Sequence, residues 1–248
     1  MLMTVIGRDT SASVYGELAG VRVLITGLSA TCGVDVARAF ADHRGRLVVQ
    51  LPEATPENDV VAGLLSETAS EIQVYTDPCA NNDAACRFAQ KASQAFGGLE
   101  VVLNLVPITS AELQNRASIA EVEDLVAQKL TIPVNVTRVV ANRMRTMMTE
   151  GLVLNVMTVP APRTAGEAAL AGVARTALAA VTRGEAEKWA PYGIRVNAIG
   201  PRTTAPEAGA YLASEPDIAA LALYLASKRG RTLSGHVFDA AGVAARRC

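Results

Sequence analysis

Short apolar runs alternate with helical patterns along almost the whole chain, and this alternation most constrains the fold. Runs such as "EVVLNLV" are apolar at nearly every position, so both faces of the strand are expected to be buried. Parallel sheets covered by helices on both sides have strands of this kind. The sequence therefore predicts an α/β fold with a doubly wound, Rossmann-like parallel sheet. Seven strands are expected, at 21–27, 46–51, 71–76, 100–106, 151–157, 194–199 and 235–242.

Helical patterns fill the intervals between these runs. They are expected at 34–43, in the late 50s and 60s, and at 83–96, 119–149, 166–190 and 217–227. No linker divides the chain, so residues 1–248 are interpreted as one domain, with residues 1–20 as an N-terminal extension. Half of the residues are hydrophobic, which is enough to bury a sizeable core.

Composition excludes several classes of function. The 23 Lys and Arg residues nearly balance the 24 Asp and Glu residues, and no basic stripe suggests nucleic acid. The apolar runs are too short to span a bilayer, and the first twenty residues do not resemble a secretory signal. Four cysteines and two histidines match no metal-ligand spacing. We expect a cytoplasmic protein with reduced thiols and no metal, nucleic-acid or membrane site.

Several segments resemble landmarks of the short-chain dehydrogenase/reductase family. "LITGLSATCGVDVARAF" is similar to its phosphate-binding turn, "GGLEVVLNLVP" to its fourth strand and "YGIRVNAIGPR" to the strand after its catalytic helix. "LYLASKRGRTLSGHVFDAAG" resembles its last helix and strand. These landmarks occur in the family's order over residues 20–242. The resemblance implies a single Rossmann-like domain.

The family's four catalytic positions carry other residues here. The resemblance implies Tyr and Lys on the helix at 166–190, where counting back from "RVN" places Ala171 and Arg175. Thr158 is nearest to the family's Ser, and Leu130 falls at its Asn. The sequence therefore predicts that this chain has no catalytic residues of the family's kind.

The phosphate-binding turn is also altered. Gly27 and Gly33 keep the glycines that the resemblance assigns to the tight bend and to helix packing, but Thr31 replaces the glycine beside the pyrophosphate. Asp35 follows in the first helical turn, where its carboxylate either repels phosphate or only satisfies the helix dipole.

The adenosine side of this site is changed as well. Pro52 and Glu53 stand where an acid would hold the ribose, and no Arg or Lys is present there to hold a 2′-phosphate. Asp77 and Asn104 match family positions that line the adenine side, although both residue types also close loops. We interpret the site as vestigial and expect this chain to bind no cofactor. The segment 202–215 is too short for more than one short helix of a substrate lid.

Together these departures predict a non-catalytic subunit that assembles with an intact NAD-dependent paralogue and supports it. Its pattern of losses resembles that of a non-catalytic subunit in a hydroxyacyl-CoA dehydrogenase of this family. Helices at about 119–149 and 166–190 are expected to form the interface of this hetero-oligomer, with NAD held by the partner. The second helix is rich in small residues that suit close helix contact.

Two alternatives remain open at this point. The first is an active enzyme with altered chemistry, either an atypical oxidoreductase or one similar to halohydrin dehalogenases, which Arg175 and "LTIPVNV" at 130–136 resemble. The second is a sensor that binds a nucleotide without turning it over.

Overall fold

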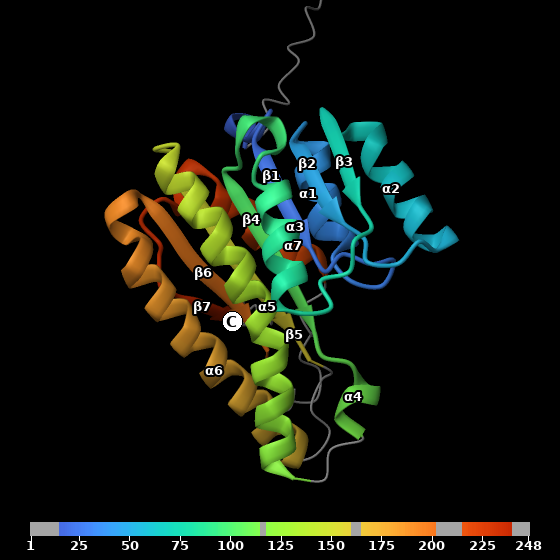
Figure 1. Cartoon of the computed structure of the whole chain (residues 1–248), viewed down its shortest axis with the longest axis vertical. Helices are drawn as coiled ribbons and strands as arrows, with labels where there is room; N and C mark the ends of the chain where they lie inside the picture. The colour runs from blue at the N-terminus through green and yellow to red at the C-terminus, as the bar shows by residue number, and fades with distance from the viewer. Residues whose placement is uncertain (1–14, 115–117, 160–164, 202–214, 240–248) are drawn as a thin grey trace, which may run out of the picture.

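A single parallel sheet between two layers of helices forms the protein in this computed structural model (Figure 1). The structure describes residues 15–114, 118–159, 165–201 and 215–239. The sheet has seven strands in the order β3-β2-β1-β4-β5-β6-β7, and every pairing is parallel. The predicted fold class is confirmed. The strands are β1 Arg22–Thr26, β2 Arg46–Gln50, β3 Glu71–Tyr75, β4 Val101–Pro107, β5 Gly151–Thr158, β6 Ile194–Gly200 and β7 Val237–Asp239.

The helices pack on the sheet as two groups. Helix α1 contacts α2 and α7, whereas α5 contacts α3 and α6. Short 3-10 turns mark several helix or strand boundaries. The helices are α1 Val34–Asp42, α2 Pro56–Thr68, α3 Asn82–Ala92, α4 Ser110–Gln114, α5 Ile119–Thr146, α6 Ala165–Trp189 and α7 Glu215–Ala226, and the 3-10 turns are η1 Gly16–Leu18, η2 Ala95–Gly97, η3 Ala190–Tyr192 and η4 Lys228–Gly230.

The central strands are buried on both faces, as their composition predicts. Leu24 packs with the α3 and α5 layer, and its neighbour Ile25 packs with the α1 and α7 layer. This alternation follows from the two-residue period of a strand. A third apolar cluster joins α5 and α6 to the ends of β4 and β5 and includes Leu130 and Met157.

A row of buried polar side chains crosses the middle of the sheet. Thr26 Oγ1 donates to Asn104 Oδ1 over 3.0 Å, and Asn104 Nδ2 donates to Asn155 Oδ1 over 2.8 Å. The same Nδ2 donates to Thr137 Oγ1 on α5 over 3.2 Å. The amide of Asn104 therefore joins β1, β4, β5 and α5, and it is fully buried.

Two expectations need qualification, namely the N-terminal extension and the loss of a substrate lid. Leu18, within the proposed extension, is buried in the core, so the last residues of that segment belong to the fold. Residues 1–14 lie outside the described residues, as do residues 202–214 and with them the expected loss of a lid. Among the described residues, no helix is long and apolar enough to span a membrane.

Candidate functional site

The carboxyl ends of the strands form one edge of the sheet, where doubly wound folds bind their ligands. The strand order reverses between β1 and β4, so the turn after β1 lies at the topological switch point. Sheet register aligns Thr26 with Asn104 and Asn104 with Asn155. The ends of β1, β4 and β5 consequently reach the same edge, although they are far apart in sequence.

Two glycines shape the turn between β1 and α1. Gly27 has a φ of +71°, and a Cβ there would lie 2.3 Å from the carbonyl oxygen of Leu105. Gly33 has a φ of +85°, and a Cβ there would lie 2.0 Å from Leu105 Cδ1. Only glycine therefore lets the turn and the start of α1 pack against the end of β4.

The middle of this turn presents hydroxyl groups at the surface. Thr31 is exposed, and its hydroxyl lies 3.3 Å from that of Ser29. Hydrogen bonding within α1 begins with Ala37 N–H donating to the carbonyl of Gly33, so the preceding N–H groups have no acceptor inside the helix. Hydroxyl and N–H donors of this kind suit the oxygens of a pyrophosphate. The half-buried Asp35 carboxylate in the first turn opposes this attraction.

Two buried side chains that sequence reasoning missed hold the turn. Gln50 Oε1 accepts from Gly27 N–H over 3.2 Å, and its Nε2 donates to the carbonyl of Asp77 over 3.0 Å. Asn58 Oδ1 accepts from Ala30 N–H over 3.1 Å. In the sequence, this role was indicated only by the glutamine that ends the apolar run "RLVVQ". Both side chains position backbone, because their own polar atoms are used in these contacts.

The two residues expected on the adenine side have different surroundings. The carboxylate of Asp77 is largely exposed and lies 3.8 Å from Lys91 Nζ, at the carboxyl end of β3. Asn104 is inside the sheet, where its amide is fully used in the polar row described above. The structure thus favours a structural role for Asn104 and leaves Asp77 open to a ligand.

The four positions matching the family's catalytic residues lie in three environments. Ala171 and Leu130 are buried, and Leu130 belongs to the apolar cluster under α5 and α6. Thr158 is half-buried at the end of β5. Arg175 Nη1 donates to the carbonyl of Pro201 over 3.2 Å and pairs with Asp239 over 2.6 Å. Among the four, only Thr158 and Arg175 therefore offer polar groups.

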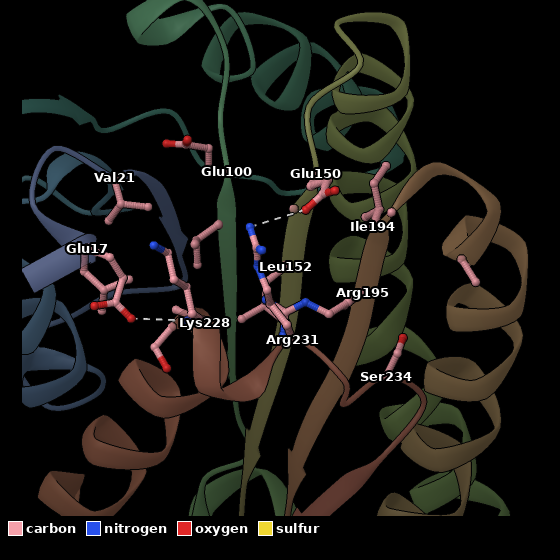
Figure 2. A pocket seen from close by; sticks show the side chains of 17 residues that line it. Glu17, Val21, Glu100, Glu150, Leu152, Ile194, Arg195, Lys228, Arg231 and Ser234 are labelled. Atoms are coloured by element: carbon pink, nitrogen blue, oxygen red, sulfur yellow. Dashed lines mark hydrogen bonds and ion pairs between the residues drawn. The ribbon is translucent and has the colours of Figure 1, made fainter. Parts of the chain in front are cut away.

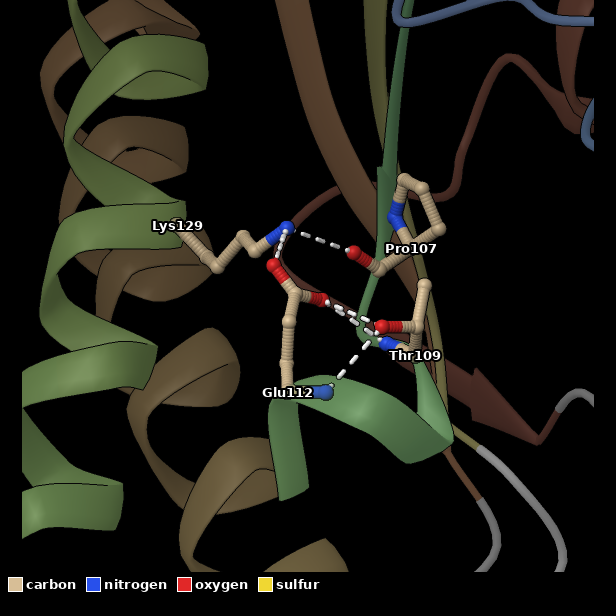
Figure 3. A network of polar contacts seen from close by, with 4 residues as sticks. All are labelled: Pro107, Thr109, Glu112 and Lys129. Carbon is tan, nitrogen blue, oxygen red and sulfur yellow. Dashed lines mark hydrogen bonds and ion pairs between the residues drawn. The ribbon is translucent and has the colours of Figure 1, made fainter. Parts of the chain in front are cut away.

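A cluster of polar groups that the sequence reasoning missed follows β4 at the same edge (Figure 3). Lys129 Nζ lies 2.7 Å from Glu112 Oε1 and donates to the carbonyl of Pro107 over 3.1 Å. Glu112 Oε2 accepts from both the N–H and the hydroxyl of Thr109, over 2.9 and 3.1 Å. Pro107 is paired in register with Thr158. The Lys129 ammonium thus lies one strand away from the Thr158 position.

The carboxylate in this cluster is stabilised in its charged form. Burial raises the pKa of Glu112, but hydrogen bonds from Lys129 and Thr109 and the charge of Lys129 outweigh burial, so the pKa lies below its ordinary value of 4.5. Glu112 is therefore an anion at neutral pH. It holds Lys129 in place and is unsuited to accept a proton there.

A cavity of about 560 Å³ lies at the opposite edge, beside the amino ends of β4, β5 and β6 (Figure 2). Its charged groups largely have partners of their own. Glu17 accepts from the N–H of Lys228, and Arg231 lies 3.7 Å from Glu150. Arg195 donates to the carbonyls of Leu225 and Gly230, both over 2.8 Å. Three acidic and three basic side chains line this cavity, so it favours neither an anionic nor a cationic ligand.

No metal site is present among the described residues, because no three His, Cys, Asp or Glu side chains cluster suitably. Cys32, Cys79 and Cys86 form no disulfide, and burial raises the pKa of the Cys79 thiol. These thiols therefore give no indication of metal or disulfide chemistry.

Comparison with known proteins identifies the family. The model of the short chain dehydrogenase family matches residues 21–217, which is most of the chain. The chain belongs to this family.

Two relatives illustrate the similarity. The chain is 26% identical over 250 residues to 3beta-hydroxysteroid dehydrogenase 1 of Eggerthella lenta, covering 89% of this chain and 92% of that protein. It is 25% identical over 246 residues to the mitochondrial borneol dehydrogenase of Lavandula x intermedia, covering 91% of each. Both relatives are named as dehydrogenases.

Solved structures share the fold at lower identity. The NADH-dependent reductase A1-R′ complexed with NAD superposes with a TM-score of 0.73 at 18% identity, covering 94% of this chain and 99% of that one. A short chain dehydrogenase from Mycobacterium smegmatis superposes with a TM-score of 0.73 at 20% identity, covering 94% and 95%.

Two expectations drawn from the sequence are overturned. The expected non-catalytic subunit is wrong, because family membership and relatives named as dehydrogenases favour the active alternative. The expected lack of a cofactor on this chain is wrong for the same reason, because the chain belongs to the short chain dehydrogenase family. In the structure Thr31 is exposed and its hydroxyl lies 3.3 Å from that of Ser29, so the replacement of glycine leaves polar groups at the surface of the turn.

The Glu112 network predicts a specific pH dependence of stability. A lowered pKa in the folded state means that the ionised carboxylate stabilises the fold above pH 4.5, and that this contribution is lost as pH falls below that value. We expect Glu112→Gln to lower the free energy of unfolding by about 1 kcal/mol at pH 7. Urea unfolding at pH 7 and pH 3 measures the difference, which should disappear at the lower pH. Glu123→Gln, at an exposed position of α5, is the control, and a pH-independent loss in Glu112→Gln would contradict the assignment.

Proposed function

We propose that this protein is an NAD(H)-dependent oxidoreductase that interconverts a small-molecule alcohol and its carbonyl compound without the family's tyrosine. The observation that carries the proposal is the turn after β1. Its glycines pack against Leu105 at the switch point of a short chain dehydrogenase fold, and donors remain at its surface. The proposal corresponds to the alternative of an active enzyme with altered chemistry, and specifically to an atypical oxidoreductase.

The residues around the turn fit a dinucleotide. Ser29, Thr31 and the first N–H groups of α1 would hold the pyrophosphate, and Asp77 lies at the adenine side. Residues 51–54, after β2, include no Lys or Arg to pair with a 2′-phosphate, while Glu53 would repel one. We therefore favour NAD(H) over NADP(H).

Proton transfer is assigned to Lys129. Bound NAD would supply the hydride acceptor or donor of the reaction. In carbonyl reduction, the Lys129 ammonium held by Glu112 would donate a proton to the carbonyl oxygen and become a neutral amine. In alcohol oxidation, that amine would take the hydroxyl proton and become the ammonium again. The hydroxyl of Thr158, on the neighbouring strand, would bind the same oxygen.

Nucleotide binding can be tested with one substitution in the turn. Thr31→Asp should weaken NADH binding at least about tenfold, because it adds a carboxylate beside the pyrophosphate position. Ser66→Asp, at an exposed position of α2, is the control and should leave binding unchanged. NADH fluorescence titration gives the dissociation constants. Failure of the wild type to saturate with NADH would exclude the proposed cofactor.

Turnover tests the role of Lys129. The assay follows NADH formation at 340 nm with NAD and a panel of cyclic and open-chain secondary alcohols. Lys129→Met should lower kcat by about 10²-fold or more while leaving NADH affinity unchanged, because it removes the proton acceptor.

Lys228→Met, at the amino edge, is the matched control and should retain full activity. Unchanged activity in Lys129→Met would refute the assigned role. Saturable NADH binding without turnover on any alcohol would instead favour a nucleotide-binding sensor.

We also propose that the exposed face of α6 around Ala180 joins a second chain of the same family. The expectation that α5 shares this interface stays a prediction. On α6, Cβ atoms at Gly172 and Gly184 would meet nothing within 4 Å, and Ala180 is exposed on the same helix. Small exposed residues of this kind let a second helix approach closely. Ala177, by contrast, packs inside this chain against the cluster around Leu130, so it is not a clean probe of the interface.

A bulky residue at position 180 tests this assembly. Ala180→Trp should convert the oligomer to a smaller species, because an indole in a close helix contact costs about 1–3 kcal/mol per site. Size-exclusion chromatography with light scattering measures the mass. Ser66→Trp, at an exposed position of α2, should leave the mass unchanged. A monomeric wild type would contradict the proposal.

A further inference from the structure

A second cavity, of about 670 Å³, lies where the carboxyl ends of α3, α5 and α6 come together. These helix ends are in the upper half of Figure 1, away from the carboxyl edge of the sheet. The lining includes Arg138, Arg143 and Arg145 of α5 and Lys188 and Trp189 of α6. A volume of this size is in the range of small-molecule sites.

The charge of this cavity is one-sided. Four cationic side chains line it, and no carboxylate does so among the described residues. The charge of Arg138 is balanced by Glu185, which is not part of the cavity lining. Arg138 Nε lies 2.8 Å from Glu185 Oε1, and Glu185 Oε2 accepts from Trp189 Nε1 over 2.8 Å. Three cations, on Arg143, Arg145 and Lys188, remain without a carboxylate partner within the described part of the chain.

Helix dipoles do not cancel this charge. Cations near helix carboxyl ends are commonly explained by attraction to the roughly half negative charge at each end. Three such ends contribute about −1.5 elementary charges against three unpaired cations. A net positive charge therefore remains in the cavity, which distinguishes it from the balanced cavity of Figure 2.

The positions of the cations are consistent with a charged ligand in the cavity. Arg143 Nε is buried and has no hydrogen-bond acceptor among the described residues, so this guanidinium is not neutralised from inside the fold. Arg145 and Lys188 lie over the rings of Tyr192 and Trp189, which holds their charges at the cavity.

We propose that this cavity binds a small, multiply charged anion of the phosphate class, at a site separate from the dinucleotide turn. Guanidinium groups match phosphate oxygens with paired N–H donors, and two arginines and a lysine can share a ligand with several anionic oxygens. Asn142 and Gln94 add neutral polar groups to the lining.

Inorganic tripolyphosphate is the probe, and calorimetry of the full-length protein at constant ionic strength measures its binding. Trp189 is the only tryptophan of the chain and lies in the cavity wall, so its emission should change with the same dissociation constant. Arg145→Gln and Lys188→Gln should each weaken binding about tenfold, with NADH affinity unchanged. Arg44→Gln, exposed between α1 and β2 and outside the cavity, is the matched control and should bind as the wild type does.

Three results would overturn the proposal. The first is no heat of binding at millimolar tripolyphosphate. The second is equal weakening in Arg44→Gln, which would indicate only general charge attraction. The third is competition by NADH, which would place the anion in the turn after β1.

Discussion

The buried amide of Asn104 is the interaction on which the arrangement of the sheet most depends. It accepts from Thr26 and donates to Asn155 and Thr137, so one side chain satisfies partners on β1, β5 and α5. Removing any partner would leave a buried polar group unsatisfied, at a cost of about 1–3 kcal/mol. This requirement favours one register among three strands. That register brings the turn after β1 and the ends of β4 and β5 to the same edge.

The two edges of the sheet consequently have different chemistry. At the carboxyl edge, glycines, hydroxyls and helix N–H groups follow β1, and the Lys129–Glu112 pair follows β4. At the amino edge, one cavity has balanced charges and the other, under the carboxyl ends of three helices, has an excess of positive charge. Dinucleotide chemistry and anion binding are therefore proposed at opposite ends of the same layers.

Because the family's Tyr and Lys are absent, the proposed reaction needs another group to move the proton. Ala171 is buried without a polar group, and Arg175 is engaged by Asp239 and the carbonyl of Pro201. Lys129 approaches the same edge from a different helix. The expectation of an inactive subunit treated the missing groups as decisive, whereas membership in a family of dehydrogenases favours a different source for the proton.

The sequence by itself determined the fold class and the limits of most strands, because β-branched and apolar runs bury both faces and periodic segments form helices. Through the family resemblance it also identified Gly27 and Gly33, and both have positive φ angles in the structure. Only the tertiary structure decided that Thr31 lies exposed, that Gln50 and Asn58 hold the turn, and that Glu112 meets Lys129. Those contacts join residues up to 28 positions apart, and their geometry depends on strand register and helix packing, which no local pattern encodes. The positive cavity has the same origin, because three helices separated in sequence bring their carboxyl ends together only in the folded chain.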